Sequence, residues 1–172
     1  EYGDHATQVA TLVSQAVDRF KQTTGVFPEK VALHYYKRFG KAEITAIGNA
    51  LAERNANVKI AFVSIDDSHP LRAYDFRVED GSFPRGNYAK LRDNELLLST
   101  TGFTPLSKKR MGTPVLLKLT LRQFPEPFVE IEQVAEHVLA LTRLNYKALT
   151  PIVGEPVTMK YAALAARFMA AF

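Results

Sequence analysis

Hydrophobic residues recur at helical spacing in four stretches of the chain. Residues 4–24 and 41–55 carry apolar side chains three and four positions apart, separated by polar and charged residues. Residues 128–144 and the Ala-rich residues 157–172 show the same period. This spacing predicts four amphipathic helices, each with one side turned toward a core.

Shorter stretches rich in β-branched and aromatic residues lie between these helices. Residues 30–36 and 114–121 have the composition of strands. Residues 58–65 (VKIAFVSI) are almost continuously apolar, which is typical of a strand covered on both faces. Residues 72–77 and 95–99 are shorter strand candidates. The alternation of helices and strands predicts an α/β fold with a right-handed crossover between parallel strands.

Composition narrows the class of protein. The chain has 172 residues, of which 47% are hydrophobic, so it can bury a core and wholesale disorder is excluded. It has no Cys, which excludes disulfide scaffolds, thiolate zinc sites and cysteine nucleophiles. No apolar run approaches the roughly 20 residues of a membrane span, and we expect a cytoplasmic protein. Because the first residues are neither a signal peptide nor an initiator Met, we expect a piece of a longer chain.

The net charge of +4 is unevenly distributed. Residues 96–125 carry five basic residues and no acid, and residues 138–172 carry four basic residues against one acid, Glu155. Clustered cations with few carboxylates indicate a polyanion partner, although a solvated basic face would have the same composition. The nine basic residues are Lys108, Lys109, Arg110, Lys118, Arg122, Arg143, Lys147, Lys160 and Arg167.

Motifs with a defined chemistry are few. No His pair has zinc-ligand spacing, and His34 in a predicted strand is expected to be a core residue. Asp66 and Asp67 follow a predicted strand, where they would either bind Mg²⁺ or form a turn. Residues 112–114 (GTP), after a Lys-Lys-Arg run, could offer backbone amides and cations to phosphates.

Several short motifs occur in a fixed order along the chain. They are G-x-x-P at 25–28, LHYYKR at 33–38, AFVSIDDSHP at 61–70, PRG at 84–86, RMGTPVLLKL at 110–119, LTRLNYKALTP at 141–151 and PVTMKYAALAARF at 156–168. In this order the chain, over nearly all of residues 1–172, resembles the C-terminal half of the PIWI domain of prokaryotic Argonaute proteins. The resemblance implies the C-terminal portion of an RNase H-like α/β fold, with a mixed sheet flanked by helices. It also implies that a MID domain and N-terminal modules lie outside this chain.

The resemblance bears on catalysis as well. Active members of the family hold two Mg²⁺ ions across the scissile phosphate with four carboxylate or His ligands. The first two ligands would precede Glu1 or fall close to it. The third would follow the strand at 30–36, where Tyr36 and Lys37 stand, and the fourth would fall at Ala163. These residues cannot replace a carboxylate, so the resemblance implies a cleavage-deficient member that is not an enzyme, with no catalytic and no metal-ligating residue in this chain.

For such a member the resemblance implies guide-strand and target binding, in prokaryotic defence against foreign DNA. We expect guide contacts at Arg143, Lys147 and Arg167, the last near the guide 5′-phosphate. Three consecutive cations are expected to contact guide or target: Lys108, Lys109 and Arg110. The expected partners are a guide RNA or DNA, a complementary target strand, the remainder of the Argonaute chain and an associated effector protein, without a membrane. No cofactor is expected in this chain, and Mg²⁺ would bind at the guide 5′-phosphate in the complete protein.

Two other interpretations remain open. One is an active Mg²⁺-dependent RNase H-type guided nuclease that draws its carboxylates from Glu43, Asp66, Asp67 or Asp75. The other is a structural α/β module of a larger assembly. Guide-dependent binding without cleavage would distinguish a cleavage-deficient Argonaute from both of these alternatives.

Overall fold

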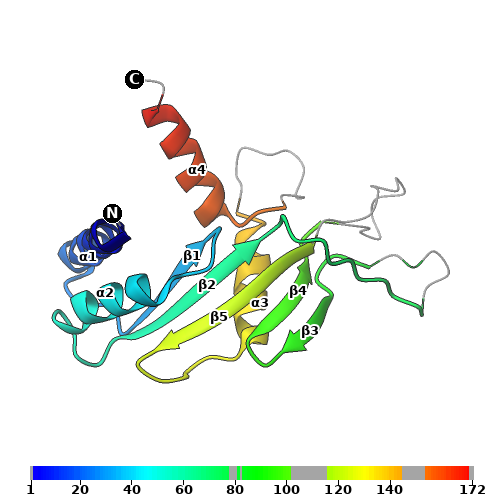
Figure 1. Ribbon diagram of the computed structural model, residues 1–172, viewed down its shortest axis with the longest axis horizontal. Helices are drawn as coiled ribbons and strands as arrows, with labels where there is room; N and C mark the ends of the chain where they lie inside the picture. The colour runs from blue at the N-terminus through cyan, green and yellow to red at the C-terminus, as the bar shows by residue number, and fades with distance from the viewer. Residues whose placement is uncertain (1, 78–80, 82, 102–115, 145–153, 171–172) are drawn as a thin grey trace.

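The chain forms one mixed sheet with helices packed on both of its faces (Figure 1). The computed structural model describes residues 2–77, 81, 83–101, 116–144 and 154–170. In chain order the elements are α1 (Tyr2–Thr24), β1 (Lys30–Tyr35), α2 (Lys41–Ala52), β2 (Lys59–Asp66), β3 (Tyr88–Arg92), β4 (Glu95–Ser99), β5 (Leu116–Phe124), α3 (Ile131–Leu141) and α4 (Val157–Met169).

The sheet has five strands in the order β1-β2-β5-β4-β3. β1 and β2 are parallel and are joined through α2, whereas the β2–β5, β5–β4 and β4–β3 pairs are antiparallel. β2 lies between β1 and β5 and is buried from Ile60 to Ile65, which explains its continuous apolar sequence. The mixed sheet flanked by helices is the architecture that the sequence predicted.

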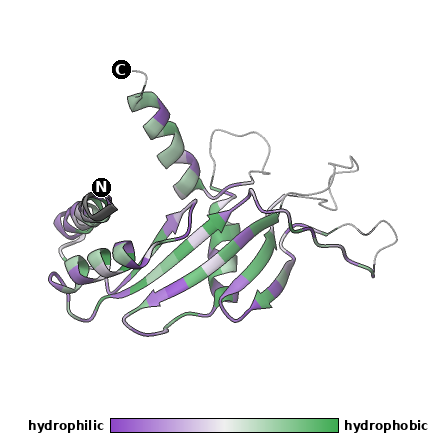
Figure 2. Cartoon of the chain, viewed as in Figure 1, coloured by the Kyte–Doolittle hydropathy of each residue, from purple (hydrophilic) through white to green (hydrophobic). Residues whose placement is uncertain are grey.

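Each face of the sheet builds its own core. On one face, α1 and α2 cover β1 and β2, with Ile47, Leu51 and Phe62 at the centre of the cluster. On the other face, α3 covers the sheet, and Leu119 packs with Ile131 and other buried residues. Apolar residues accordingly run along the middle strands in Figure 2. Because successive residues of a strand face opposite sides, β5 alternates between the α3 core and the opposite face.

One strand prediction is wrong, and one strand was missed. The predicted strand at 72–77 does not form: the Asp75 amide donates to the Gly81 carbonyl at 3.2 Å, and Asp75 binds the amide and guanidinium of Arg77. This local polar bonding replaces pairing with a strand. β3 was not predicted, because its short sequence YAKLR mixes apolar and charged residues without β-branched side chains and lies largely exposed at the sheet edge.

The other elements match the prediction in kind and differ at their ends. α2 ends at Ala52 rather than at residue 55, and α3 spans Ile131–Leu141 rather than 128–144. β5 continues to Phe124, while residues 114 and 115 of the predicted strand lie outside the described residues. These shifts leave the order of the elements unchanged.

Candidate nucleic-acid interface

A cavity of about 500 Å³ opens at the end of the sheet where β2 and β4 finish and α4 begins. Its size is in the range of pockets that hold small ligands. Five parts of the chain line the cavity: the residues just after β2, the residues just after β4, β5, the segment before α4, and α4 itself. The lining residues are Asp67, Thr100, Thr101, Leu117, Gly154, Glu155, Lys160, Ala163, Leu164 and Arg167.

One face of α4 supplies the cations of this cavity. Lys160, Ala163 and Arg167 are spaced three and four residues apart, so they share one side of the helix, and all three line the cavity. Asp67 and Glu155 line it as well. The cavity therefore has a cationic wall on α4 beside two carboxylates, and a small residue stands between the two cations.

Arg85 holds the segments that border the cavity. Its guanidinium donates to the Thr100 carbonyl and to Thr142 Oγ1, the latter at 2.6 Å. Thr100 Oγ1 in turn donates to the Gly154 carbonyl at 2.6 Å. Burial lowers the pKa of Arg85, and the positive charge of nearby Arg143 lowers it further. A second pair of cations therefore lies close to the residues that form the cavity.

The predicted binding residues fall into two groups. Arg167 lines the cavity, and Arg143 is exposed just beyond α3, where its charge acts on Arg85. The remaining four predicted residues lie outside the described residues: Lys108, Lys109, Arg110 and Lys147. Arg85 and Lys160 were not predicted as site residues. The PRG motif at 84–86 and the basic excess of residues 138–172 are the sequence signals that contained them.

The family resemblance expects metal ligands just after β1 and on α4, and other side chains stand at both places. Tyr36 is 57% exposed after β1, and the Lys37 ammonium lies 5.0 Å from the centroid of its ring. Ala163 is exposed on α4 and lines the cavity. Neither Lys37 nor Ala163 offers an oxygen to a divalent cation, and the positive charge of Lys37 opposes one.

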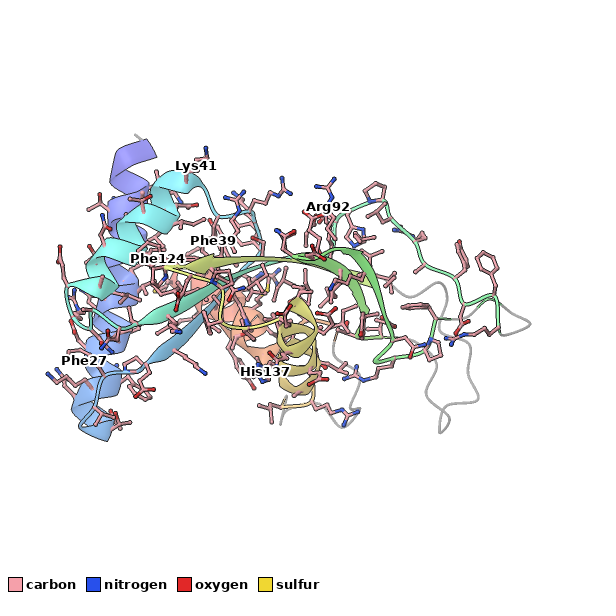
Figure 3. All side chains as sticks on the ribbon, turned by 90° about the horizontal axis from the view of Figure 1, so that it is seen from below. Phe27, Phe39, Lys41, Arg92, Phe124 and His137 are labelled. Atoms are coloured by element: carbon pink, nitrogen blue, oxygen red, sulfur yellow. The ribbon has the colours of Figure 1, made fainter. Side chains whose placement is uncertain are left out.

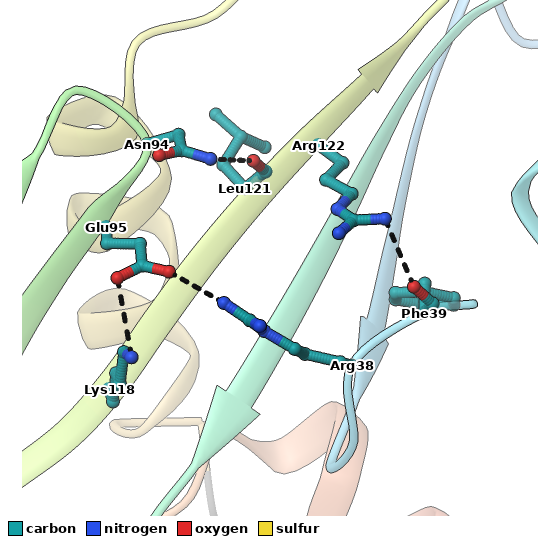
Figure 4. A network of polar contacts seen from close by, with 7 residues as sticks. All are labelled: Arg38, Phe39, Asn94, Glu95, Lys118, Leu121 and Arg122. Carbon is teal, nitrogen blue, oxygen red and sulfur yellow. Dashed lines mark hydrogen bonds and ion pairs between the residues drawn. The ribbon is translucent and has the colours of Figure 1, made fainter. Parts of the chain in front are cut away.

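The segment that follows β1 is fastened across the sheet (Figure 4). Phe39 packs on Phe62, with ring centroids 5.1 Å apart, and Arg122 donates to the Phe39 carbonyl at 3.4 Å. Arg38 Nη2 lies 3.0 Å from Glu95 Oε1, and Lys118 Nζ lies 3.4 Å from Glu95 Oε2. Burial disfavours ionised Glu95, but Lys118 and Arg38 outweigh it, so the pKa of this carboxyl is lowered.

The carboxylates of the alternative nuclease interpretation are engaged locally. Glu43 Oε2 accepts from the Gly40 amide at 2.6 Å, and Asp66 Oδ1 accepts from the Ser68 amide at 2.8 Å, which is the turn considered from the sequence. Asp67 accepts from the Ser68 hydroxyl, and Asp75 binds Arg77. Within the described ranges no group of three or more His, Asp or Glu side chains is placed to hold a metal ion.

His34 connects β1 to α4 through a side-chain contact. Its Nδ1 lies 2.8 Å from Thr158 Oγ1 in the first turn of α4. Burial lowers the pKa of His34, and nearby His137 of α3 lowers it further. Figure 3 shows His137 on one side of the sheet and Phe39, Lys41 and Arg92 on the other. The histidine contact thus lies on the same side of the sheet as α3.

The fold of this chain is similar to that of a protein of known structure. No family model matches the sequence, and no curated protein is significantly similar to it. Among solved structures, the chain is similar to the Argonaute of Marinitoga piezophila, a crystal structure in complex with 5′-OH guide RNA. The TM-score is 0.64 at 18% sequence identity, over 90% of this chain and 21% of that one. The chain therefore has an Argonaute-like fold and spans about a fifth of that neighbour's length.

No helix among the described residues is both long enough and apolar enough to cross a membrane.

Proposed function

We propose that this chain is the C-terminal half of the PIWI domain of a prokaryotic Argonaute of the cleavage-deficient type. In this proposal it holds a guide strand and its paired target. The observation that carries the proposal is the α4 face on which Lys160, Ala163 and Arg167 line one cavity, in a chain with an Argonaute-like fold.

The arrangement of cations suits a nucleic-acid backbone. Lys160 and Arg167 wall the cavity, and Arg85 and Arg143 lie close to one another near its border. Contacts of Lys and Arg with phosphate oxygens provide affinity and position without reading sequence. Such contacts suit a protein whose target choice is made by base pairing to a guide. The solved neighbour is itself a complex with guide RNA, which supports this proposal.

The absence of cleavage is proposed from two residues in particular. Two-metal hydrolysis of a phosphodiester needs ligands that clamp both ions. Lys37 after β1 and Ala163 on α4 stand where the family resemblance expects a carboxylate or His, and neither residue can act as one. A Mg²⁺ ion at the guide 5′ end would in this proposal be held by the phosphate and by residues elsewhere in the protein. At the cavity, Lys160 and Arg167 supply positive charge without a metal.

A binding protein that does not cut needs another protein to act on the bound target. The proposal therefore includes an associated effector protein, a role in prokaryotic defence against foreign DNA, and the remainder of the Argonaute chain as a packing partner. An effector would be recovered with the full-length protein only when guide and target are both present.

Charge reversal tests the proposed interface. In the full-length protein, Arg167→Glu should weaken guide binding and reduce the slope of log affinity against log salt by about one for each lost phosphate contact. Arg19→Glu is the matched control, because Arg19 is exposed on α1, outside the cavity lining. Equal affinity of the Arg167→Glu and Arg19→Glu variants would favour the structural-module interpretation instead.

A further inference from the structure

Arg85 lies in a tight turn whose backbone is fixed by its neighbours. The Asn87 amide donates to the Pro84 carbonyl at 3.1 Å, which closes the turn around Arg85 and Gly86. Gly86 has a φ of +89°, the left-handed backbone that the third residue of such a turn requires and that glycine adopts without strain. The Gly86 amide also donates to the Ser99 carbonyl at 2.8 Å, which ties the turn to the end of β4. Arg85 therefore leaves the backbone from a fixed position.

The guanidinium of Arg85 joins two segments that are distant in sequence. It donates to the carbonyl of Thr100, just after β4, and to Thr142 Oγ1 at the end of α3, the latter at 2.6 Å. Thr100 is 0% exposed and Thr142 is 1% exposed. The Thr142 hydroxyl gives its own proton to the Leu139 carbonyl at 2.6 Å, so it can only accept from Arg85. A planar guanidinium can serve two acceptors in fixed directions, which a single ammonium group cannot do in the same way.

A third segment joins this network through Thr100. Thr100 Oγ1 donates to the carbonyl of Gly154 at 2.6 Å, just before Pro156 at the N-cap of α4. A Cβ at Gly154 would lie 3.5 Å from the side chain of Thr101, so the segment before α4 runs close to the segment after β4. Arg85 thus holds the ends of β4 and α3 directly, and the segment that leads into α4 through Thr100.

The position of α4 bears directly on the cavity. None of the residues of α4, all of which the structure describes, is buried. Near the first turn of the helix, Thr158 Oγ1 lies 2.8 Å from His34 Nδ1, and Met159 packs against the core beneath α3. Lys160 and Arg167 lie further along the same helix and line the cavity. A shift of the segment before α4 would therefore move both cations.

These contacts suit a residue that places the cavity wall rather than one that touches the ligand. Arg85 does not line the cavity, and two of its nitrogens donate to protein acceptors. Burial and the charge of Arg143 lower the pKa of Arg85, and charge-assisted hydrogen bonds to buried oxygens offset that cost. We propose that Arg85 is a positioning residue whose guanidinium sets the place of α4, and with it Lys160 and Arg167, for the nucleic-acid backbone. This inference rests on the proposed function, because it needs a strand bound at the cavity.

A double-mutant cycle on guide affinity tests the inference in the full-length protein. Arg167→Gln should weaken guide binding about 10- to 100-fold, the value of a hydrogen bond between charged groups. Arg85→Gln should weaken it by a similar factor, because it misplaces the cations of α4. The double variant should bind no more than about 2-fold more weakly than Arg85→Gln, since the Arg167 contact is already lost, whereas independent contacts would multiply.

Three more variants separate positioning from charge. Arg85→Lys keeps the charge and should bind guide as weakly as Arg85→Gln, because one ammonium group cannot hold both acceptors. Thr100→Val removes the hydroxyl that reaches the segment before α4, so it should show part of the same coupling, and it carries the cycle if Arg85→Gln does not fold. Arg122→Gln is the matched control, because Arg122 also donates to a backbone carbonyl, that of Phe39 at 3.4 Å, but lies outside the cavity lining.

Three results overturn the inference and leave the proposed function standing. The first is multiplication of the two losses in the double variant, which would make Arg85 an independent contact. The second is full guide affinity of Arg85→Lys, which would show that charge alone suffices. The third is a folded Arg85→Gln variant with a lower melting temperature but unchanged guide affinity, which would limit the network to stability. A wild-type protein that binds no guide contradicts the proposed function itself.

Discussion

Glu95 provides a quantitative test of how the segment after β1 is held to the sheet. The residue is 6% exposed, and Arg38 and Lys118 bind its two carboxylate oxygens (Figure 4). Glu95→Gln removes the charge while keeping the shape. The contact to Arg38, whose side chain is 66% exposed, should contribute no more than about 1 kcal/mol. The contact to Lys118, whose side chain is 24% exposed, should contribute about 1–2 kcal/mol.

The expected loss of stability for Glu95→Gln is therefore about 1–3 kcal/mol, which corresponds to a fall in melting temperature of about 2 to 12 °C for a chain of this size. Urea unfolding of the 172-residue chain followed by circular dichroism measures the free-energy difference. The lowered pKa of Glu95 gives this contribution a pH dependence. It is present above the ordinary value of 4.5 and is lost as the pH falls through the folded-state pKa.

The wild-type protein and the Glu95→Gln variant should consequently approach one another in stability as the pH falls below 4.5 and through the lowered folded-state pKa of Glu95. Arg38→Ala serves as the control and should cost less than Glu95→Gln, because the Arg38 side chain is mostly in water. A Glu95→Gln loss below about 0.5 kcal/mol at pH 7, within the range of an ordinary surface substitution, would refute the reasoning. So would an Arg38→Ala variant that is as unstable as Glu95→Gln.

Two further predictions concern packing and α4. A Cβ at Gly48 would lie 3.0–3.1 Å from the Phe124 ring. Gly48→Ala should therefore destabilise the chain by about 1–3 kcal/mol, although Ala has a better helix propensity than Gly. Adding Phe124→Leu should recover part of this loss, as measured by urea unfolding. Burial and then His137 lower the pKa of His34, so the folded state favours neutral His34 and should lose stability as the pH falls below the ordinary value of 6.5. His34→Gln should flatten this dependence below pH 6.5 in thermal unfolding, and an unchanged pH profile would contradict the reasoning.

Most of the fold could be predicted because the buried helices and strands show their burial in their own order of apolar and polar residues. β2 is apolar along its length since both faces are buried, and the helices keep an apolar stripe. β3 was missed because an exposed edge strand has no apolar pattern to reveal it, and the strand predicted at 72–77 was wrong because Asp75 binds Arg77 locally. Strand order could not be derived, since it depends on pairings between distant segments.

The candidate site was predictable in part. Arg167 was expected from the family resemblance and lines the cavity, and Arg143 lies near Arg85. Arg85 was missed because a single Arg in a PRG turn carries no sign that its guanidinium will bridge two distant segments. Lys160 was seen only as part of a basic excess, because its role depends on which face of α4 borders the cavity.

The central claim is guided binding without cleavage, and one measurement tests it most directly. Full-length protein loaded with guide is mixed with a labelled complementary target in Mg²⁺, and bound and cleaved target are measured in the same samples. We predict guide-dependent retention of an intact target, weakened by Arg167→Glu and unchanged by Arg19→Glu. Guide-dependent cleavage of the target that is lost in Asp66→Ala would contradict the account and favour the nuclease interpretation.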